Sequence, residues 1–127
     1  MFTEYGCKTL LSVYFGEMAP PKLFLALYRE TGAGVKEVFG GGYERVEAKG
    51  VIEIVGTKAR NAKDVVWPVA RRDWGQVVAV ALVTEDGEEV ARNEIDVRVG
   101  VGEKLRIPAE SLFVSLVNGS NLSPEKP

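Results

Sequence analysis

The chain contains no histidine and a single cysteine, Cys7, among its 127 residues. The absence of histidine excludes the Ser-His-Asp and Cys-His arrangements of nucleophilic enzymes, together with the commonest general base and metal ligand. One cysteine cannot form an internal disulfide, which fits assembly in a reducing cytoplasm. The sequence therefore predicts a non-enzymatic protein with no catalytic residues, no metal site and no bound cofactor.

The chain also lacks a strong charge of one sign and a long apolar run. Its net charge of −2 gives no basic surface, so we expect neither nucleic acid nor a membrane as a partner. No apolar stretch approaches the ~20 residues that span a bilayer, and the N-terminus shows no Sec-type signal pattern. The sequence has one glutamine, and Glu, Lys and Arg supply most of its charge. That composition favours a thermophilic source.

Residues 1–19 are predicted to form a short helix and a linker. Within residues 3–15, apolar side chains recur at three- and four-residue steps: Cys7, Leu10, Leu11, Tyr14 and Phe15. This spacing places them on one face of a helix. Gly16 ends the helix, and Pro20 and Pro21 prevent its continuation. We expect Cys7 to be a buried small hydrophobe on the apolar face.

Residues 20–117 carry the signals of short strands. The predicted strands cover residues 23–28, 43–48, 51–55, 65–67, 76–84, 90–95, 97–101, 104–107 and 112–117. Turn signals separate them, among them a polar loop at 58–64 and an Asp-Gly hairpin at 86–87. We therefore predict an all-β fold, an antiparallel β-sandwich of about eight or nine short strands with the helix packed against it. Residues 118–127 are predicted to be a flexible polar C-terminal tail.

Residues 76–84 differ from the other predicted strands because they are apolar at nearly every position. Both faces of such a strand should be covered. One face would meet the opposing sheet, and the other would meet the helix or a neighbouring subunit. Val78, Val80 and Leu82 are therefore candidate structural or interface residues. Further along, residues 109–111 are predicted to form a single helical turn.

Two clusters resemble binding motifs but have simpler explanations. Gly40, Gly41 and Gly42 lack the GxGxxG spacing and the Gly-Lys-Ser/Thr ending of a phosphate loop, and a strand follows them. They are better explained by positive φ angles in a turn. Acidic residues gather at 85–89, where carboxylates suit a hard cation. Their place on a hairpin favours a solvated turn.

Four segments carry a family pattern in a fixed order: PPKLFLALY at 20–28, GGGYERV at 40–46, DWGQV at 73–77 and GEKLRIPA at 102–109. From about residue 10 to residue 117, the chain resembles a family of small phage virion proteins usually labelled phage tail fibre or minor tail proteins. That family has a proline-led strand, a GGxYxRV turn and strand, a DWG step and a closing segment that ends in Pro-Ala. The resemblance implies a small β-domain built into the particle.

The remaining candidate residues come from the helix and from the family pattern. They are Leu10, Leu11, Tyr14, Tyr43, Arg71, Arg72, Asp73 and Trp74. Two arginines beside a tryptophan suit recognition of a phosphate or a sugar, but arginine stems more often cover apolar surface. The resemblance favours a structural role because DWG begins a strand in the family. The paired arginines are unusual for the family and are candidates for an intersubunit salt bridge.

The leading interpretation is a virion structural protein of the tail or fibre, assembled by subunit packing in the host cytoplasm. Its expected partners are other virion proteins and copies of itself, with a trimer favoured by analogy alone. One alternative is a head decoration protein that stabilises the shell through many weak contacts. Another is a host-surface adhesin that binds a glycan through exposed aromatic side chains.

Overall fold

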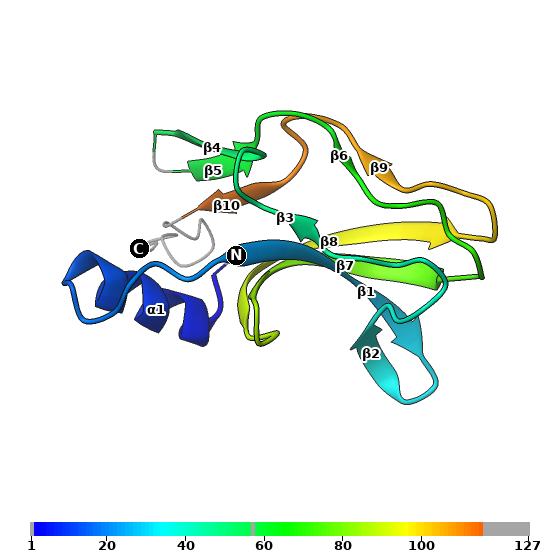
Figure 1. The fold of residues 1–127 in the computed structure, drawn as a ribbon, viewed down its shortest axis with the longest axis horizontal. Helices are drawn as coiled ribbons and strands as arrows, with labels where there is room; N and C mark the ends of the chain where they lie inside the picture. The colour runs from blue at the N-terminus through cyan, green and yellow to red at the C-terminus, as the bar shows by residue number, and fades with distance from the viewer. Residues whose placement is uncertain (1, 57, 116–127) are drawn as a thin grey trace, which may run out of the picture.

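The computed structural model describes residues 2–56 and 58–115. These residues form one helix and ten short strands in antiparallel sheets (Figure 1). The bounds are α1 (Glu4–Tyr14), β1 (Leu23–Thr31), β2 (Gly34–Glu37), β3 (Val46–Glu47), β4 (Ile52–Val55), β5 (Lys58–Asn61), β6 (Val65–Val66), β7 (Gly75–Thr84), β8 (Glu89–Val99), β9 (Arg106–Ile107) and β10 (Phe113–Ser115). The prediction of a mostly β fold with one N-terminal helix is confirmed.

The largest sheet has the order β2-β1-β7-β8, and β3 pairs with another part of β1. Leu25 lies opposite Leu82, and Leu27 lies opposite Val80, across β1 and β7. Because side chains alternate along a strand, these four residues share one face of the sheet. That face belongs to the main hydrophobic core.

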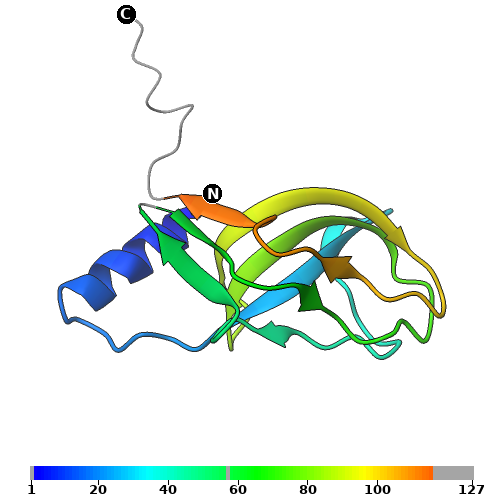
Figure 2. The same ribbon diagram turned by 90° about the horizontal axis from the view of Figure 1, so that it is seen from above.

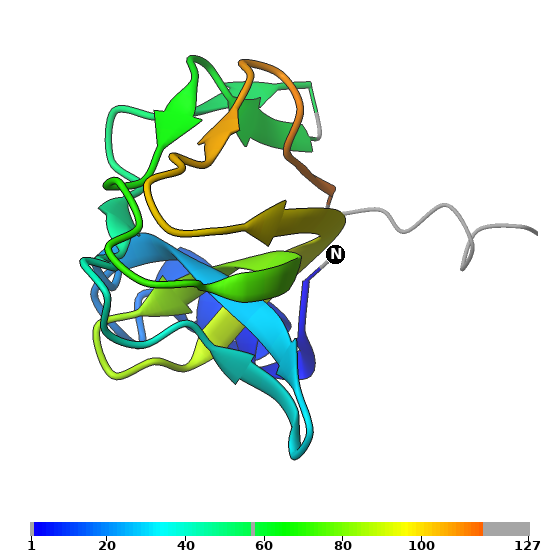
Figure 3. The same ribbon diagram turned by 90° about the vertical axis from the view of Figure 1, so that its right-hand side faces the viewer.

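Two small sheets, β10-β5-β4 and β6-β9, lie on the core side of the large sheet (Figures 1 and 3). Their strands and flanking segments supply the other half of the core with Val65, Trp67, Leu105, Ile107 and Leu112. Trp67 is completely buried. The core therefore joins segments that are far apart in the sequence.

The opposite face of the large sheet is lined by small residues. Ala26, Ala81 and Val83 are fully buried there, and Phe24 and Tyr28 pack against them. The prediction that both faces of residues 76–84 are covered is confirmed. The cover differs from the expectation, since two aromatic residues of β1 supply it from within the same sheet.

β8 lies at the edge of the large sheet, with β7 as its neighbour. Its first half is bridged by Phe2, which pairs with Ala91. In its second half the exposed positions are Glu94, Asp96 and Arg98, while the intervening Ile95 and Val97 pack against the core. This edge therefore presents charged side chains at every second residue.

Three predicted segments are wrong. Lys58–Asn61 forms β5 instead of a polar loop. Arg60 lies opposite Glu53 of β4, and the two side chains form an ion pair at 2.7 Å that stabilises this polar strand pair. Glu89–Val99 is one strand with register shifts instead of two strands. The expected helical turn at 109–111 is an ordinary turn, since Glu110 has a φ of 65°.

Other strands differ in extent from their predictions. The strand expected at 43–48 is reduced to β3, because the Tyr43 amide closes a turn onto the Gly40 carbonyl at 3.1 Å. The sequence does not predict β2, because Gly32 and Gly34 are typical of a loop. Within residues 112–115 the last predicted strand is found as β10. The rest of that strand and the tail predicted over 118–127 lie outside the described residues.

Candidate assembly surface

α1 is anchored to β8 through its first turn. Thr3 caps the helix by accepting a hydrogen bond from the Gly6 amide at 2.9 Å. The Thr3 amide donates to the Val90 carbonyl at 2.9 Å, and the Thr3 hydroxyl donates to the Glu89 carbonyl at 2.5 Å. A β-carbon at Gly6 would lie 2.0 Å from the Val90 carbonyl oxygen. Glycine is therefore required for this close contact between helix and strand.

Replacement of Gly6 by alanine is expected to loosen α1 from β8. Alanine stabilises an isolated helix by about 1 kcal/mol relative to glycine. If Gly6→Ala nevertheless destabilises α1, the close contact with Val90 is the cause. We expect a loss of about 1–3 kcal/mol, typical of overpacking. Hydrogen exchange of the α1 amides would measure it. Lys8→Ala is the matched control, and equal protection in the two variants would contradict the contact.

The face of α1 that points away from the sheet is apolar. Gly6 and Thr9 are buried on the inner face, and Ser12 and Val13 are half-buried. The outer stripe, as we call it, consists of Cys7, Leu10, Leu11, Tyr14 and the C-cap residue Phe15. The exposed fractions are 41% for Leu10, 57% for Leu11, 81% for Tyr14 and 70% for Phe15.

The outer stripe is the same set of residues that the helical periodicity groups on one face, and that face lies in solvent. The prediction that Cys7 is buried is therefore wrong. The cause is on the other side of the helix, where small residues allow the backbone to approach β8 closely. α1 runs away from the sheets at one end of the molecule (Figures 1 and 2). Apart from the Cys7 thiol and the Tyr14 hydroxyl, the stripe is hydrocarbon, and what it offers chemically is apolar area for a partner.

Tyr43 and Trp74 form a second candidate cluster, at the end of the domain away from α1. Trp74 is 1% exposed, and its indole nitrogen donates to the Gly41 carbonyl at 3.1 Å. The two rings meet edge to face with centroids 5.7 Å apart. The Tyr43 hydroxyl accepts from the Leu27 amide at 3.0 Å and donates to Glu37 at 2.7 Å. The cluster therefore joins the three segments at 20–28, 40–46 and 73–77.

Arg45 and Glu37 extend this cluster through a bidentate pair. Arg45 Nε and Nη2 each donate to a Glu37 oxygen at 2.8 Å. Burial opposes the charge on Glu37, but the hydrogen bonds from Arg45 and Tyr43 outweigh it and hold the pKa of Glu37 below its usual range. Burial, and then the hydrogen bond to Glu37, raises the pKa of Tyr43. Both groups therefore keep one protonation state at neutral pH, as a structural network does.

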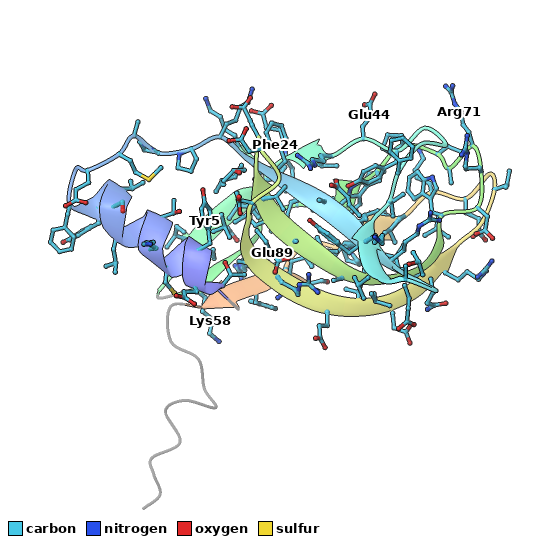
Figure 4. The ribbon with its side chains drawn as sticks, turned by 90° about the horizontal axis from the view of Figure 1, so that it is seen from below. Tyr5, Phe24, Glu44, Lys58, Arg71 and Glu89 are labelled. Atoms are coloured by element: carbon cyan, nitrogen blue, oxygen red, sulfur yellow. The ribbon has the colours of Figure 1, made fainter. Side chains whose placement is uncertain are left out.

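Glu37→Gln is expected to flatten the pH dependence of stability under acidic conditions. The folded pKa of Glu37 lies below its unfolded value of about 4.3, so its stabilisation is present above that pH and is lost as pH falls through the folded pKa. Urea unfolding between neutral pH and about pH 3 would measure the slope. Glu44, whose side chain points into solvent (Figure 4), gives the control Glu44→Gln. A wild-type slope in Glu37→Gln would refute the network.

The glycine turn has the positive φ angles that were predicted, at 73°, 60° and 84° for Gly40, Gly41 and Gly42. A β-carbon at Gly41 would lie 2.2 Å from Cγ of Arg72. The stem of Arg71 lies against Gly42 in the same way, and the Arg71 side chain points outward (Figure 4). Both arginine stems therefore cover the turn, and an intersubunit salt bridge of these arginines stays a prediction.

The other candidate residues are separate from both clusters. Asp73 is exposed, accepts from the Gly75 amide at 2.9 Å and pairs with Arg98. Val80 is buried, and Leu82 is partly buried against the main core. Val78 falls at the register shift of β7. These residues stabilise the domain and do not form a shared surface.

Several residues that matter here carry no clear signal in the sequence. Gly6 sits inside a helical pattern, where a glycine indicates weakness more often than a contact. Glu37 is one acidic residue among many. Tyr43 and Arg45 both stand in the GGGYERV segment at 40–46, and Tyr43 is the member of the network named among the candidate residues.

Within residues 2–56 and 58–115, no group of His, Cys, Asp or Glu side chains could hold a metal ion. The part of the chain that the structure describes also contains no helix long and apolar enough to cross a membrane. No known protein family and no curated protein matches the chain.

Proposed function

We propose that the protein is a non-enzymatic structural component of a phage virion, a β-domain of the tail or fibre held in place by subunit packing. The outer stripe of α1 carries this proposal. Five apolar side chains in contact with solvent on one helix face are rare in a protein that works alone, and such patches mark interaction sites. The expected partners are other virion proteins and copies of this chain.

The place of the family segments in the fold supports the structural interpretation. Residues from 20–28, 40–46 and 73–77 meet in the Tyr43–Trp74 cluster, where they bond one another. These segments thus contribute to the stability of the fold, which suits a structural component of a particle. We infer further that the three sheets act as the two layers of an antiparallel β-sandwich, with α1 as an arm outside it.

Immunogold electron microscopy of purified particles would test the proposal. An antibody against the folded domain is expected to label the tail or its tip. Label spread over the head would replace the tail location by head decoration. Intact particles and tails without label would contradict a virion role. A purified domain that binds host polysaccharide, and loses that binding on Tyr→Ala changes, would instead favour an adhesin.

A further inference from the structure

We propose that the outer stripe of α1 is a self-association surface, covered by the outer stripe of a second copy of this chain. This inference rests on the proposed function, because it names the partner of the surface from which that function is argued. The argument uses the orientation of the helix, its apolar area, its charge and its access.

The orientation of α1 is fixed by the domain itself. Thr3 and Gly6 bind the first turn to β8, and Thr9 is buried on the same side. The helix cannot turn the outer stripe inward without breaking the Thr3 cap and the Gly6 contact. The stripe is therefore a permanent surface of the domain.

The area of the stripe approaches what each subunit buries in a standard interface. Tyr14 and Phe15 expose more than two thirds of their surface, and a buried aromatic side chain contributes roughly 150–250 Å². With Leu10, Leu11 and Cys7, the stripe offers on the order of 600 Å² per chain, against roughly 800 Å² per partner in a standard interface. Contacts at the rim would supply the remainder.

A second copy fits this surface better than a strongly charged partner. Glu4 and Lys8 are the charged residues of α1 and lie one turn apart, so the helix carries no net charge from its side chains. The chain as a whole has a net charge of −2, so two copies repel each other little. When the same patch serves on both subunits, each buries its apolar face at the same time.

Among residues 2–56 and 58–115, access to the stripe is open. α1 extends beyond the sheets at one end of the molecule (Figure 2), and its main contact with the strands is with β8 on the inner side. Other exposed apolar side chains, such as Phe39, Ile54 and Val101, are spread over separate turns and strands. Isolated residues of that kind are normal on a protein surface, whereas the stripe is contiguous.

Sedimentation velocity of the purified protein over micromolar to millimolar concentrations would test this inference. The wild type is expected to associate, and Leu11→Glu and Tyr14→Glu should each raise the dissociation constant roughly 30-fold or more. Glutamate is a good helix former, so α1 should persist. Val101→Glu, which changes an exposed valine outside the stripe, is the matched control and should associate like the wild type. The fluorescence of the two buried tryptophans reports that each variant is folded.

Cys7 provides a second readout, because it lies in the stripe and is the one cysteine of the chain. Maleimide labelling of Cys7 should slow as the concentration rises, and the Leu11→Glu variant should remove that dependence. The inference would be overturned if the wild type stays monomeric at the highest concentration. It would also be overturned if Leu11→Glu and Tyr14→Glu both associate as strongly as the wild type. If the protein stays monomeric in solution but the antibody labels virions, the self-association inference is wrong and the proposed function stands. If the protein associates but virions carry no label, the proposed function is wrong and the self-association inference stands.

Discussion

Asn61→Ala is expected to lower the free energy of unfolding by about 3–4 kcal/mol. Asn61 is completely buried at the end of β5. Its amide nitrogen donates to the carbonyls of Lys63 at 3.0 Å and Pro108 at 2.8 Å. Its side-chain oxygen accepts from the amides of Ser111 at 3.0 Å and Leu112 at 2.8 Å. Alanine would leave four backbone groups without these partners. Leu112 is the one buried residue among the four, and such a buried group costs about 1–3 kcal/mol when nothing replaces the bond, whereas water can replace part of the other three.

Asn93 offers a control of the same residue type and the same kind of bond. Its side chain bonds the amide and the carbonyl of Phe113, each within 2.8 Å, in a more exposed place. Asn93→Ala should therefore cost about 1 kcal/mol, since water can replace the lost partners. Urea unfolding followed by tryptophan fluorescence measures both variants. Equal losses would show that burial of the Asn61 network does not determine its contribution.

Trp74→Ala is expected to cost about 3–5 kcal/mol, the range for removing a buried large aromatic side chain. The change leaves a cavity beside Tyr43 and removes the indole bond to Gly41. The glycine turn and the Glu37–Arg45 pair would both lose support, because Tyr43 connects them to Trp74. Trp67, buried in the main core, still reports unfolding by its fluorescence.

Asp73→Ala separates the structural role of Trp74 from that of its neighbour. Asp73 and Arg98 are both largely exposed, so this variant should lose about 1 kcal/mol or less. Incorporation of each variant into particles gives the decisive comparison. A Trp74→Ala variant with unchanged stability and lost incorporation would make Trp74 an interface residue, against the assignment to the fold.

The helix and most strands of this protein can be predicted from the sequence, whereas the residues that surround them are harder to predict. The two-faced strand at 76–84, the Asp-Gly hairpin and the helix of residues 4–14 follow from patterns within a few residues of one another. The direction of the helix does not, because periodicity groups Leu10 with Tyr14 and says nothing of what covers them. Gly6 decides that question through its contact with Val90 of β8, more than eighty residues further along the chain.

Asn61 shows a second limit of the same kind. It stands in a polar stretch whose composition indicates a loop, and its partners at 108–112 are remote in sequence. An asparagine side chain can both donate to backbone carbonyls and accept from backbone amides, so this polar residue can be buried with its hydrogen bonds satisfied. Local polarity therefore predicts exposure where the long-range bonds produce burial.

The charged residues at every second position in the second half of β8 have a consequence for how this sheet can meet another chain. A bare strand edge is a template on which another chain can grow by hydrogen bonding, and charged side chains along it oppose that growth. Glu94, Asp96 and Arg98 occupy this edge of the large sheet. Charges at these positions therefore oppose edge-to-edge pairing of this sheet with another copy.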